Sequence, residues 1–332
     1  MLVTHFERLP TPGGHSIERL FRTIRMGLPS GYFPKVVHCP TPAHGRFWFP
    51  RGLWRAFRGR SDVNHIVGDV HYLALGLPGC RTILTVHDLR RLEGLTGMRK
   101  AIYRWLYFTL PMRRCRIITA ISNHTRDQLV REFPFIAKKV HVIPDCLPEG
   151  FTSNPKQFNI HRPRILQVGT QSNKNLERVI EAVSGQPCEL HIIGPLSDAQ
   201  RDLLLRSGIV YGNSVNVSDA GMIEAYKQAD LIMFVSLAEG FGMPIIEGQA
   251  TGRAVLTSCL SPMRDIAAGG ACLVNPLSVD EIRAGIRKLI GDEQYRSGLI
   301  EAGWKNVRRF GALEIAREYA DLYAAVASSS KS

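Results

Sequence analysis

The sequence predicts an α/β protein made of two Rossmann-like domains, each built on a parallel sheet. Short apolar runs of strand length alternate with amphipathic helical patterns in both halves, the order expected of right-handed βαβ units. The chain has 332 residues, more than one hydrophobic core usually serves. The stretch DCLPEG (145–150) separates the two series and is the expected linker. We therefore expect an N-terminal domain at 1–148 and a C-terminal domain at 149–332.

The first half contains one strand at its start, a loop at 10–14, and then a helix. Ser16 is a suitable N-cap, and apolar residues recur at helical spacing from Ile17 to Leu28. Four more strands follow, with one further helix between the last two. The expected strands are 2–6, 63–67, 82–86, 117–121 and 140–143, and the helix is 123–133.

The second half repeats the alternation more regularly. Ser197 and Gln200 form a capping box that starts one helix, and Ser218 caps another. The expected strands are 165–168, 189–193, 231–235, 254–257 and 271–274, and further helices are expected after 176, at 244–250 and at 279–290. A last helical pattern from Ile315 to Tyr323 ends the chain.

Composition places the chain among soluble globular proteins, with 45% hydrophobic and 21% charged residues. No apolar run reaches the roughly 18 residues of a membrane span, and the N-terminus lacks the apolar core of a signal peptide. The expected location is cytoplasmic. The seven cysteines form no CxxC pair, so neither a disulfide framework nor a metal site is expected.

The net charge of +13 lies entirely in the first half, because residues 1–155 hold 23 Lys and Arg against 10 Asp and Glu. Such a field attracts an anionic partner. Basic and aromatic residues interleave at 47–60 and 98–116. We expect 98–116 to contact an anionic membrane surface; the alternatives are a core helix with a solvated rim and a soluble acidic acceptor. No nucleic-acid-binding module is recognisable.

The stretch SLAEGFGMPIIE (236–247) carries the clearest chemistry. It follows the strand 231–235, and ligands of parallel α/β sheets bind at the carboxyl ends of strands. Gly240 and Gly242 allow a tight turn, and Pro244 suits the first turn of a helix, whose free N–H groups bind anions. Glu239 and Glu247 flank this turn, and a carboxylate can accept two hydrogen bonds from a vicinal diol. The stretch therefore indicates a sugar-nucleotide site.

At this point the sequence resembles a known family. The segments EGFGMPIIEGQATGRAVLTS, ILQVGTQSNKNLERVIEA and VSDAGMIEAYKQADLIMFVS are similar to the donor-domain motifs of the retaining GT-B glycosyltransferases of family 4. The strong match covers about 163–290. The first half matches more loosely, through PGG, TILTVHDL and ITAISNHTRDQL. The resemblance implies a GT-B fold: two Rossmann-like domains facing each other across a cleft, with the final helix packing back on the N-terminal domain.

The resemblance also implies roles for particular residues. In the donor domain, Glu239 and the backbone at Phe241, Gly242 and Met243 would bind the transferred sugar, Glu247 the ribose, and Lys174 the diphosphate. Thr170 occupies the position where the family usually has an arginine, and Asp145 replaces a commoner asparagine in the linker motif. In the first domain, Gly13 and Gly14 would approach the diphosphate and His87 would lie beside the anomeric centre. Asp69 and His71 are candidates for contact with the acceptor.

The expected reaction is retaining transfer of a hexose from a nucleoside-diphosphate sugar, with GDP-mannose preferred over a UDP-hexose, to a hydroxyl of a glycan or lipid-linked glycan. It would belong to surface polysaccharide synthesis, on the cytoplasmic face of the inner membrane. No His/Asp/Glu cluster has metal-ligand spacing, and the family implies catalysis without a metal or other cofactor. Two alternatives stay open: a sugar-nucleotide 2-epimerase on the same fold, and a non-catalytic subunit that binds nucleotide sugars.

Overall fold

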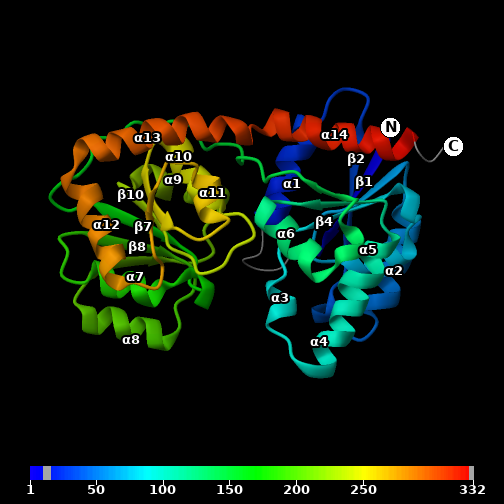
Figure 1. Cartoon of the computed structure of the whole chain (residues 1–332), viewed down its shortest axis with the longest axis horizontal. Helices are drawn as coiled ribbons and strands as arrows, with labels where there is room; N and C mark the ends of the chain where they lie inside the picture. Colours follow the sequence, from blue (N-terminus) through cyan, green and yellow to red (C-terminus); the bar gives the residue numbers. More distant parts are fainter. Residues whose placement is uncertain (10–15, 329–332) are drawn as a thin grey trace. The chain divides into compact units, whose positions relative to one another are not determined.

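A computed structural model describes residues 1–9 and 16–328 of the chain (Figure 1). They form two compact units, Met1–Cys146 with Gly311–Ser332 as unit 1 and Leu147–Phe310 as unit 2. The division after Cys146 lies two residues from the expected boundary. The last helix, however, belongs to unit 1 rather than to the C-terminal domain in which the sequence places it. The loop expected at 10–14, and with it Gly13 and Gly14, lies outside the described residues.

Unit 1 has a six-stranded parallel sheet in the order β2-β1-β3-β4-β5-β6. Helices cover both of its faces, and buried residues from β1, β3, β4 and β5 form a core on each side. The strands are β1 (Leu2–Arg8), β2 (Phe33–Cys39), β3 (Val63–Ile66), β4 (Thr82–Val86), β5 (Ile117–Ala120) and β6 (Val140–Val142). The helices are α1 (Ser16–Gly27), α2 (Trp48–Gly59), α3 (Arg90–Glu93), α4 (Gly97–Tyr103), α5 (Leu110–Arg114), α6 (Asn123–Glu132) and α14 (Ala312–Ser328).

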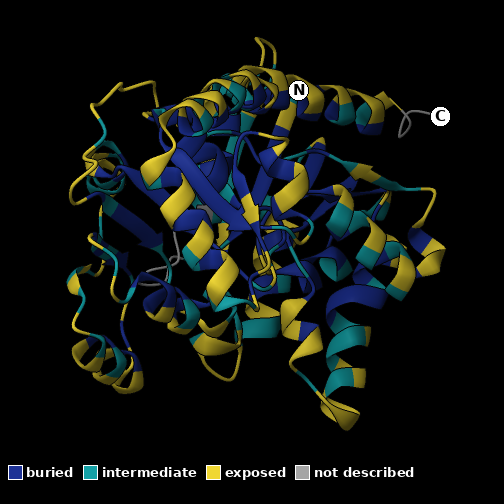
Figure 2. Cartoon of the chain, turned by 60° about the vertical axis from the view of Figure 1, so that its left-hand side comes forward, coloured by how far each residue is buried: buried dark blue, intermediate teal, exposed yellow. Residues whose placement is uncertain are grey.

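Unit 2 repeats the plan with the strand order β12-β11-β10-β7-β8-β9, again wholly parallel. The central strands β10 and β11 are buried along their whole length, as expected of a covered parallel sheet, and Figure 2 shows buried strands in dark blue beneath helices with exposed faces. The strands are β7 (Arg164–Val168), β8 (Glu189–Ile193), β9 (Val210–Ser214), β10 (Leu231–Phe234), β11 (Ala254–Ser258) and β12 (Cys272–Val274). The helices are α7 (Leu176–Val183), α8 (Asp198–Ser207), α9 (Asp219–Gln228), α10 (Met243–Thr251), α11 (Met263–Ala267), α12 (Val279–Gly291) and α13 (Glu293–Val307).

The ten strands expected from the sequence are confirmed, each within two residues of its expected ends. The helix caps at Ser197 and Ser218 are also confirmed: Ser197 accepts a hydrogen bond from the amide of Gln200, and Ser218 accepts one from the amide of Gly221. Two strands were not expected, β2 and β9. Both lie at sheet edges, where one side of a strand is not covered and the apolar pattern is weaker.

The C-terminal helix α14 packs on unit 1, as the GT-B resemblance implies. Its buried face carries Ile315, Ala316, Tyr319 and Tyr323 and joins the same core as α1. The hydroxyl of Tyr323 lies 3.0 Å from Nε2 of His5 and 2.8 Å from Nδ1 of His65, on neighbouring strands β1 and β3. The helix is thus held by apolar packing and by a buried polar network.

The segment 98–116 differs from the single amphipathic helix that the sequence suggests. It folds as α4, a π-helix at Arg104–Thr109, and α5. Because the π-helix changes the angular spacing of side chains, Thr109 is buried and Leu106 is half-buried, while Ile102 and Trp105 stay exposed. In one continuous α-helix the spacing of Ile102, Trp105, Leu106 and Thr109 predicts a single shared face, and the structure shows that this prediction is wrong.

Candidate active site

In both units the candidate residues lie where strands end at the carboxyl edge of a parallel sheet. Val168 ends β7 and Phe234 ends β10, and the segments after them carry the candidate residues of unit 2. In unit 1 the corresponding segments follow Ile66 of β3 and Val86 of β4. Open α/β sheets bind ligands at this edge.

Lys174 and Glu239 are brought together in unit 2. Nζ of Lys174 donates to Oε1 of Glu239 at 2.7 Å, and both side chains are largely buried. Lys174 also lies over the ring of Phe234, 4.7 Å from its centroid. Gly169 has φ of +90°, and a Cβ at this position would lie 3.0 Å from the side chain of Lys174. A glycine at this strand end therefore lets the lysine lie against the backbone.

Asn173 supports Glu239 from the same loop, and the sequence analysis missed it. Its Nδ2 donates to Oε1 of Glu239 at 3.0 Å and to the carbonyl oxygen of Ala238 at 2.9 Å. Glu239 thus has one oxygen contacted by two donors. Only its place next to Lys174 could have indicated this role.

Thr170 does not replace the family's arginine as a cation, and its hydroxyl is already bonded. It donates to the carbonyl oxygen of Pro195 at 2.5 Å, and Gln200 donates to the carbonyl oxygen of Thr170 at 2.9 Å. The side chain therefore joins two loops at the sheet edge. Lys174 is the cation that the structure places beside Glu239.

Helix α10 begins at the glycine turn. Gly242 is its N-cap with φ of +118°, and a Cβ here would approach the side chain of Ile245 at 3.1 Å. Phe241 is buried against Phe310, with ring centroids 5.5 Å apart. Met243 is half-buried at the first helical position, where backbone N–H groups have no partner within the helix. The turn therefore aims the positive end of α10 at the strand edge.

Glu247 is not a helix-surface residue, because α10 is buried along its length and Glu247 is only 3% exposed. Its Oε2 accepts a hydrogen bond of 2.6 Å from the hydroxyl of Tyr226 on α9. A buried carboxylate needs such donors, since burial of an unpaired charge is costly. The sequence predicted Tyr226 only as part of a helix, and its spacing in that helix did not indicate a contact with Glu247.

His87 in unit 1 is buried at the end of β4. Its Nε2 lies 2.8 Å from the carbonyl oxygen of Val67, at the end of neighbouring β3. Since a carbonyl only accepts, Nε2 carries the hydrogen, and in the neutral ring Nδ1 carries the lone pair. This contact fixes the orientation of the imidazole.

Asp69 and His71 follow β3, near His87, and differ in exposure. Asp69 is exposed and lies 3.9 Å from Arg8, whereas His71 is buried with Nδ1 3.0 Å from the carbonyl oxygen of Tyr107. Within the described residues, Nε2 of His71 is a buried nitrogen without a hydrogen-bond partner. Burial lowers the pKa of His71, although nearby Asp69 acts in the opposite direction.

Asp145, at the end of unit 1, is also buried. Burial raises the pKa of this carboxyl to about 6, and the nearby His87 partly offsets that effect. The described residues contain no group of three or more His, Cys, Asp or Glu side chains arranged to hold a metal ion.

Two family descriptions match the chain in sequence. "Glycosyltransferase Family 4" matches residues 13–148, and "Glycosyl transferases group 1" matches residues 151–306. The two matches fall on the two halves of the chain, and together they cover most of it. The two parallel α/β units, together with these sequence matches, define the class of protein as a GT-B glycosyltransferase. The chain belongs to the family 4 glycosyltransferases.

Among the similar proteins is the O-antigen chain mannosyltransferase RfbU of Salmonella typhimurium, 23% identical over 69% of this chain and 66% of that protein. The serotype-specific mannosyltransferase WbdA of Escherichia coli is 30% identical over 65% of this chain and 30% of its own length. The chain thus covers less than two thirds of the length of these relatives.

Solved structures share the fold across nearly the whole chain. The HepE protein of Anabaena in complex with UDP-glucose has a TM-score of 0.77 at 14% identity, covering 98% of this chain and 100% of that one. WaaG, a glycosyltransferase involved in lipopolysaccharide biosynthesis, has a TM-score of 0.72 at 14% identity, covering 97% and 99%. At these identities the likeness establishes the fold alone.

Proposed function

We propose that the protein is a retaining glycosyltransferase that moves a hexose from a nucleoside-diphosphate sugar to a hydroxyl of a glycan or lipid-linked glycan. The observation that carries the proposal is the arrangement at the end of β10. Lys174 and Glu239 lie in contact on one side of the glycine turn, and Glu247 is buried one helical turn beyond it. A cation, a helix N-terminus and two carboxylates there match a diphosphate, a sugar and a ribose.

In the proposed reaction the bond between the anomeric carbon and the diphosphate oxygen breaks, and a bond to the acceptor oxygen forms on the same face. The acceptor hydroxyl gives its proton to the departing phosphate. Negative charge grows on the diphosphate, and Lys174 with the N-terminus of α10 would stabilise it. His87, fixed by Val67, would orient the sugar or the acceptor. In this proposal Lys174 and the N-terminus of α10 stabilise the departing diphosphate without a metal ion.

The sugar proposed is mannose, supported by the relatives that are named as mannosyltransferases. The donor nucleotide is either guanosine diphosphate, as in the GDP-mannose expected from the sequence, or uridine diphosphate. The uridine alternative is supported by HepE, which was solved with UDP and with UDP-glucose. The proposed role in surface polysaccharide synthesis rests on the O-antigen and exopolysaccharide relatives. We propose a cytoplasmic location, where nucleotide sugars are made.

A panel of nucleotide sugars that includes GDP-mannose and UDP-glucose tests this proposal. Release of nucleoside diphosphate is measured with and without glycan and lipid-linked acceptors, and the product's anomeric configuration is determined by NMR. Acceptor-dependent release with retained configuration is expected. Epimerised donor without an acceptor would favour the epimerase alternative, and saturable binding without turnover would favour the non-catalytic one.

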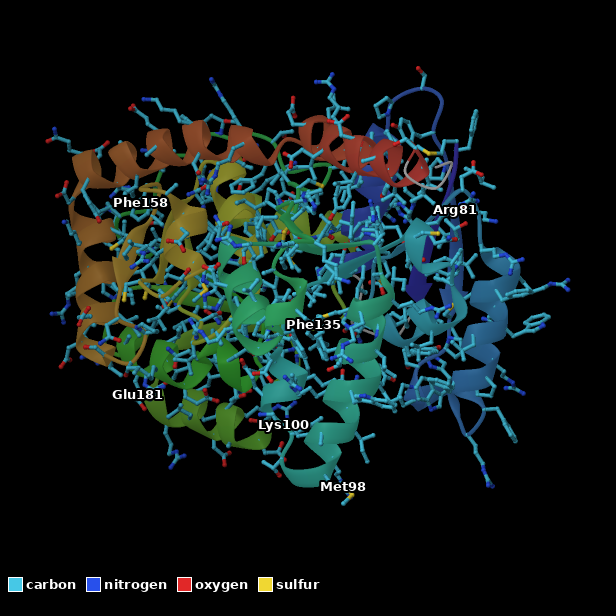
Figure 3. All side chains as sticks on the ribbon, turned by 45° about the vertical axis from the view of Figure 1, so that its right-hand side comes forward. Arg81, Met98, Lys100, Phe135, Phe158 and Glu181 are labelled. Carbon is cyan, nitrogen blue, oxygen red and sulfur yellow. The ribbon has the colours of Figure 1, made fainter. Side chains whose placement is uncertain are left out.

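We further propose that unit 1 contacts an anionic membrane surface through the segment 98–116. No helix among residues 1–9 and 16–328 is long and apolar enough to cross a membrane, so the contact would be peripheral. On α4, Met98 is 78% exposed and Ile102 is more than half exposed, and so is Trp105 in the π-helix that follows. Figure 3 shows Met98 extending away from the end of α4, with Lys100 close by. Exposed apolar side chains beside basic ones suit the membrane interface.

Helix α2 presents a second face of the same kind. Phe47, Trp54 and Phe57 are each more than half exposed. Arg58 lies over the ring of Trp54, and Arg60 over that of Phe57. The sequence has no Asp or Glu between Glu18 and Asp62, or between Glu93 and Asp127. Arg104 is paired with Glu132 at 2.7 Å, but neither segment carries an acidic residue of its own, which supports an anionic partner.

A further inference from the structure

The buried hydrogen bond between Tyr226 and Glu247 connects a core residue to the proposed donor site. Tyr226 lies on α9 and is fully buried, and Glu247 lies on α10. The distance of 2.6 Å from the tyrosine oxygen to Oε2 of Glu247 is typical of a charge-assisted O–H···O bond. Packing alone does not require this hydroxyl, since phenylalanine would fill the same volume.

Tyr226 is fixed at three points, so its hydroxyl is a stationary donor. Its ring meets the ring of Phe151 edge-on, with centroids 5.2 Å apart. Its carbonyl oxygen accepts a hydrogen bond of 3.1 Å from Nε of the buried Arg253. Its hydroxyl reaches Glu247. A carboxylate held by such a donor loses little conformational freedom when a ligand arrives.

The contact also favours the ionised form of the carboxylate. Burial disfavours an ionised carboxyl group, and a hydrogen bond donated to it favours the ionised form. A ribose diol is bound through two O–H groups that both need acceptors. Ionised Glu247 is an acceptor only, whereas a protonated carboxyl would present a donor to the ribose.

We propose that Tyr226 is a positioning residue of the donor site, which holds Glu247 ionised and oriented so that it accepts hydrogen bonds from the ribose 2′- and 3′-hydroxyls. This inference rests on the proposed function, because it takes Glu247 to be the ribose-binding residue. It goes further because it proposes that Tyr226 on α9 and Glu247 on α10 together select ribose over deoxyribose.

The test measures binding of UDP, GDP and their 2′-deoxy forms by calorimetry, using the whole chain and whichever base binds. In the unmodified protein, the ribonucleotide should bind on the order of tenfold more tightly than the deoxynucleotide, the expected loss of one hydrogen bond to a charged group. Tyr226→Phe should weaken the ribonucleotide more than the deoxynucleotide, which keeps only its 3′-hydroxyl contact, so that the ratio falls by about threefold or more. Glu247→Gln should lower the ratio further.

Tyr211→Phe, which removes a hydroxyl on β9 of the same unit, is the matched control and should leave the ratio unchanged. Melting temperatures of all variants identify any loss of folding. If Tyr226→Phe does not fold, the ribo-to-deoxy affinity ratio is measured in Tyr226→Leu and Glu247→Ala instead, since either change removes the contact without enlarging a buried side chain. A purely structural tyrosine would weaken both nucleotides equally.

The pH dependence gives a second readout. Without the tyrosine donor the ionised form of Glu247 is less favoured, so ribonucleotide affinity should fall more on acidification in Tyr226→Phe than in the unmodified protein. An unchanged ratio and an unchanged pH profile in Tyr226→Phe would overturn the inference. Equal affinity for ribo- and deoxynucleotides in the unmodified protein would instead remove the ribose assignment of Glu247 on which it rests.

Discussion

Lys174 and Glu239 neutralise each other, so each proposed ligand contact begins from a formed ion pair. The pair is largely buried, and removing one partner of such a pair leaves the other uncompensated. A diphosphate would compete with Glu239 for Lys174, and Glu239 would then be available to sugar hydroxyls, held in place by Asn173. Diphosphate binding and sugar binding would thus be coupled.

Lys174→Ala should lower turnover at least about tenfold and weaken binding of the nucleoside diphosphate, because it removes fixed positive charge where negative charge develops. Steady-state kinetics and calorimetry with the free diphosphate measure the two effects. Lys288→Ala, which removes a lysine that lies over Tyr295 in the same unit, is the charge-matched control. Unchanged kinetics in Lys174→Ala would place the diphosphate elsewhere.

The two glutamates should respond differently to substitution. Glu239→Ala should mainly lower kcat, because contacts to the transferred sugar strengthen as its bond to the diphosphate breaks. Glu247→Ala should mainly raise the Kd for the donor, because the ribose lies away from the reacting bond. Kinetic and binding constants for both variants separate these cases. Loss of affinity alone in both variants would argue against the sugar assignment of Glu239.

Asp145 should make the folded state less stable as pH rises. Its pKa of about 6 in the folded protein lies above the ordinary value of 3.8, so the folded state binds the proton more tightly than the unfolded state. The carboxyl therefore costs stability from about pH 4 upward, reaching up to about 3 kcal/mol above pH 6.

Asp145→Asn should therefore raise the melting temperature above pH 6 by several degrees, and the gain should shrink on acidification. Thermal melts from about pH 4 to about pH 8 check this, with Asp127→Asn, a change at an exposed carboxylate on α6, as the control. A gain that is the same at every pH would show that the charge of Asp145 is not its cause.

At the level of residues, the structure brings candidate side chains together where each occurs beside a strand end in the sequence. Glu239 and Lys174 each follow a strand by a short loop, and parallel strand ends meet at one edge, so their proximity was predictable. The roles of Asn173 and Tyr226 could not be predicted from the sequence, because each role depends on which carboxylate the side chain faces. For Tyr226 the partner is set by the packing of α9 on α10, across 21 residues of sequence, and for Asn173 by the meeting of two strand-end loops across 66 residues.

At the level of elements, α14 is tied to the sheet of unit 1 by Tyr323. Its hydroxyl lies between His5 and His65, and His65 continues to Thr85 at 2.7 Å. Burial, together with Arg25, lowers the pKa of His5 to about 3, and burial lowers that of His65 as well. Both rings are thus neutral in the folded protein, and each can donate through one nitrogen and accept through the other.

Tyr323→Phe should reduce the free energy of unfolding by about 1–3 kcal/mol, because it leaves buried imidazole nitrogens without a partner. Chemical denaturation at neutral pH measures the loss, with Tyr32→Phe, which removes a hydroxyl bonded to the carbonyl oxygen of Ala320, as a less buried comparison. A loss no larger than that of Tyr32→Phe would show that packing alone holds α14.

Low pH should also weaken the attachment of α14 to the sheet of unit 1, because that attachment includes His5 and His65. A histidine whose folded pKa lies below its unfolded value of 6.5 is neutral in the folded state and protonated in the unfolded state at low pH. Its contribution to stability is therefore complete above about pH 6.5 and is lost as pH falls below that value. Stability measured on the acid side should fall less steeply in His5→Gln than in the unmodified protein.

The elements that the sequence did not predict share a physical cause. The edge strands β2 and β9 are covered on fewer sides, so their residues need not be uniformly apolar. The π-helix at Arg104–Thr109 changes which residues face the core, and nothing in the local pattern marks the change. Central strands such as β4 and β10, buried on both faces, were predicted closely because burial leaves only apolar residues acceptable there.

At the scale of the whole molecule, the two units differ in charge. Unit 1 holds 25 Lys and Arg against 12 Asp and Glu, whereas unit 2 holds 17 of each. The candidate residues Lys174, Glu239 and Glu247 therefore lie in the neutral unit, and the excess of +13 lies in the other. Charge of this size acts on anionic partners over about one Debye length, so it would concentrate unit 1 at an anionic surface.

Co-sedimentation with liposomes tests the membrane contact. Binding should require anionic lipid and should fall with added salt, because each basic side chain near the surface contributes about 1 kcal/mol of screened attraction. Met98→Ser with Ile102→Ser should weaken binding by removing exposed apolar side chains from α4. Arg113→Glu with Arg114→Glu, on exposed positions of α5, should weaken liposome binding by reversing charge.

The control is Arg206→Glu with Arg287→Glu, which makes the same charge change in unit 2 and should have little effect on liposome binding. Equal loss in both charge variants would mean that net charge, not the surface formed by 98–116, governs binding. No binding to anionic liposomes at low salt would instead make a soluble acidic acceptor the partner of the basic unit.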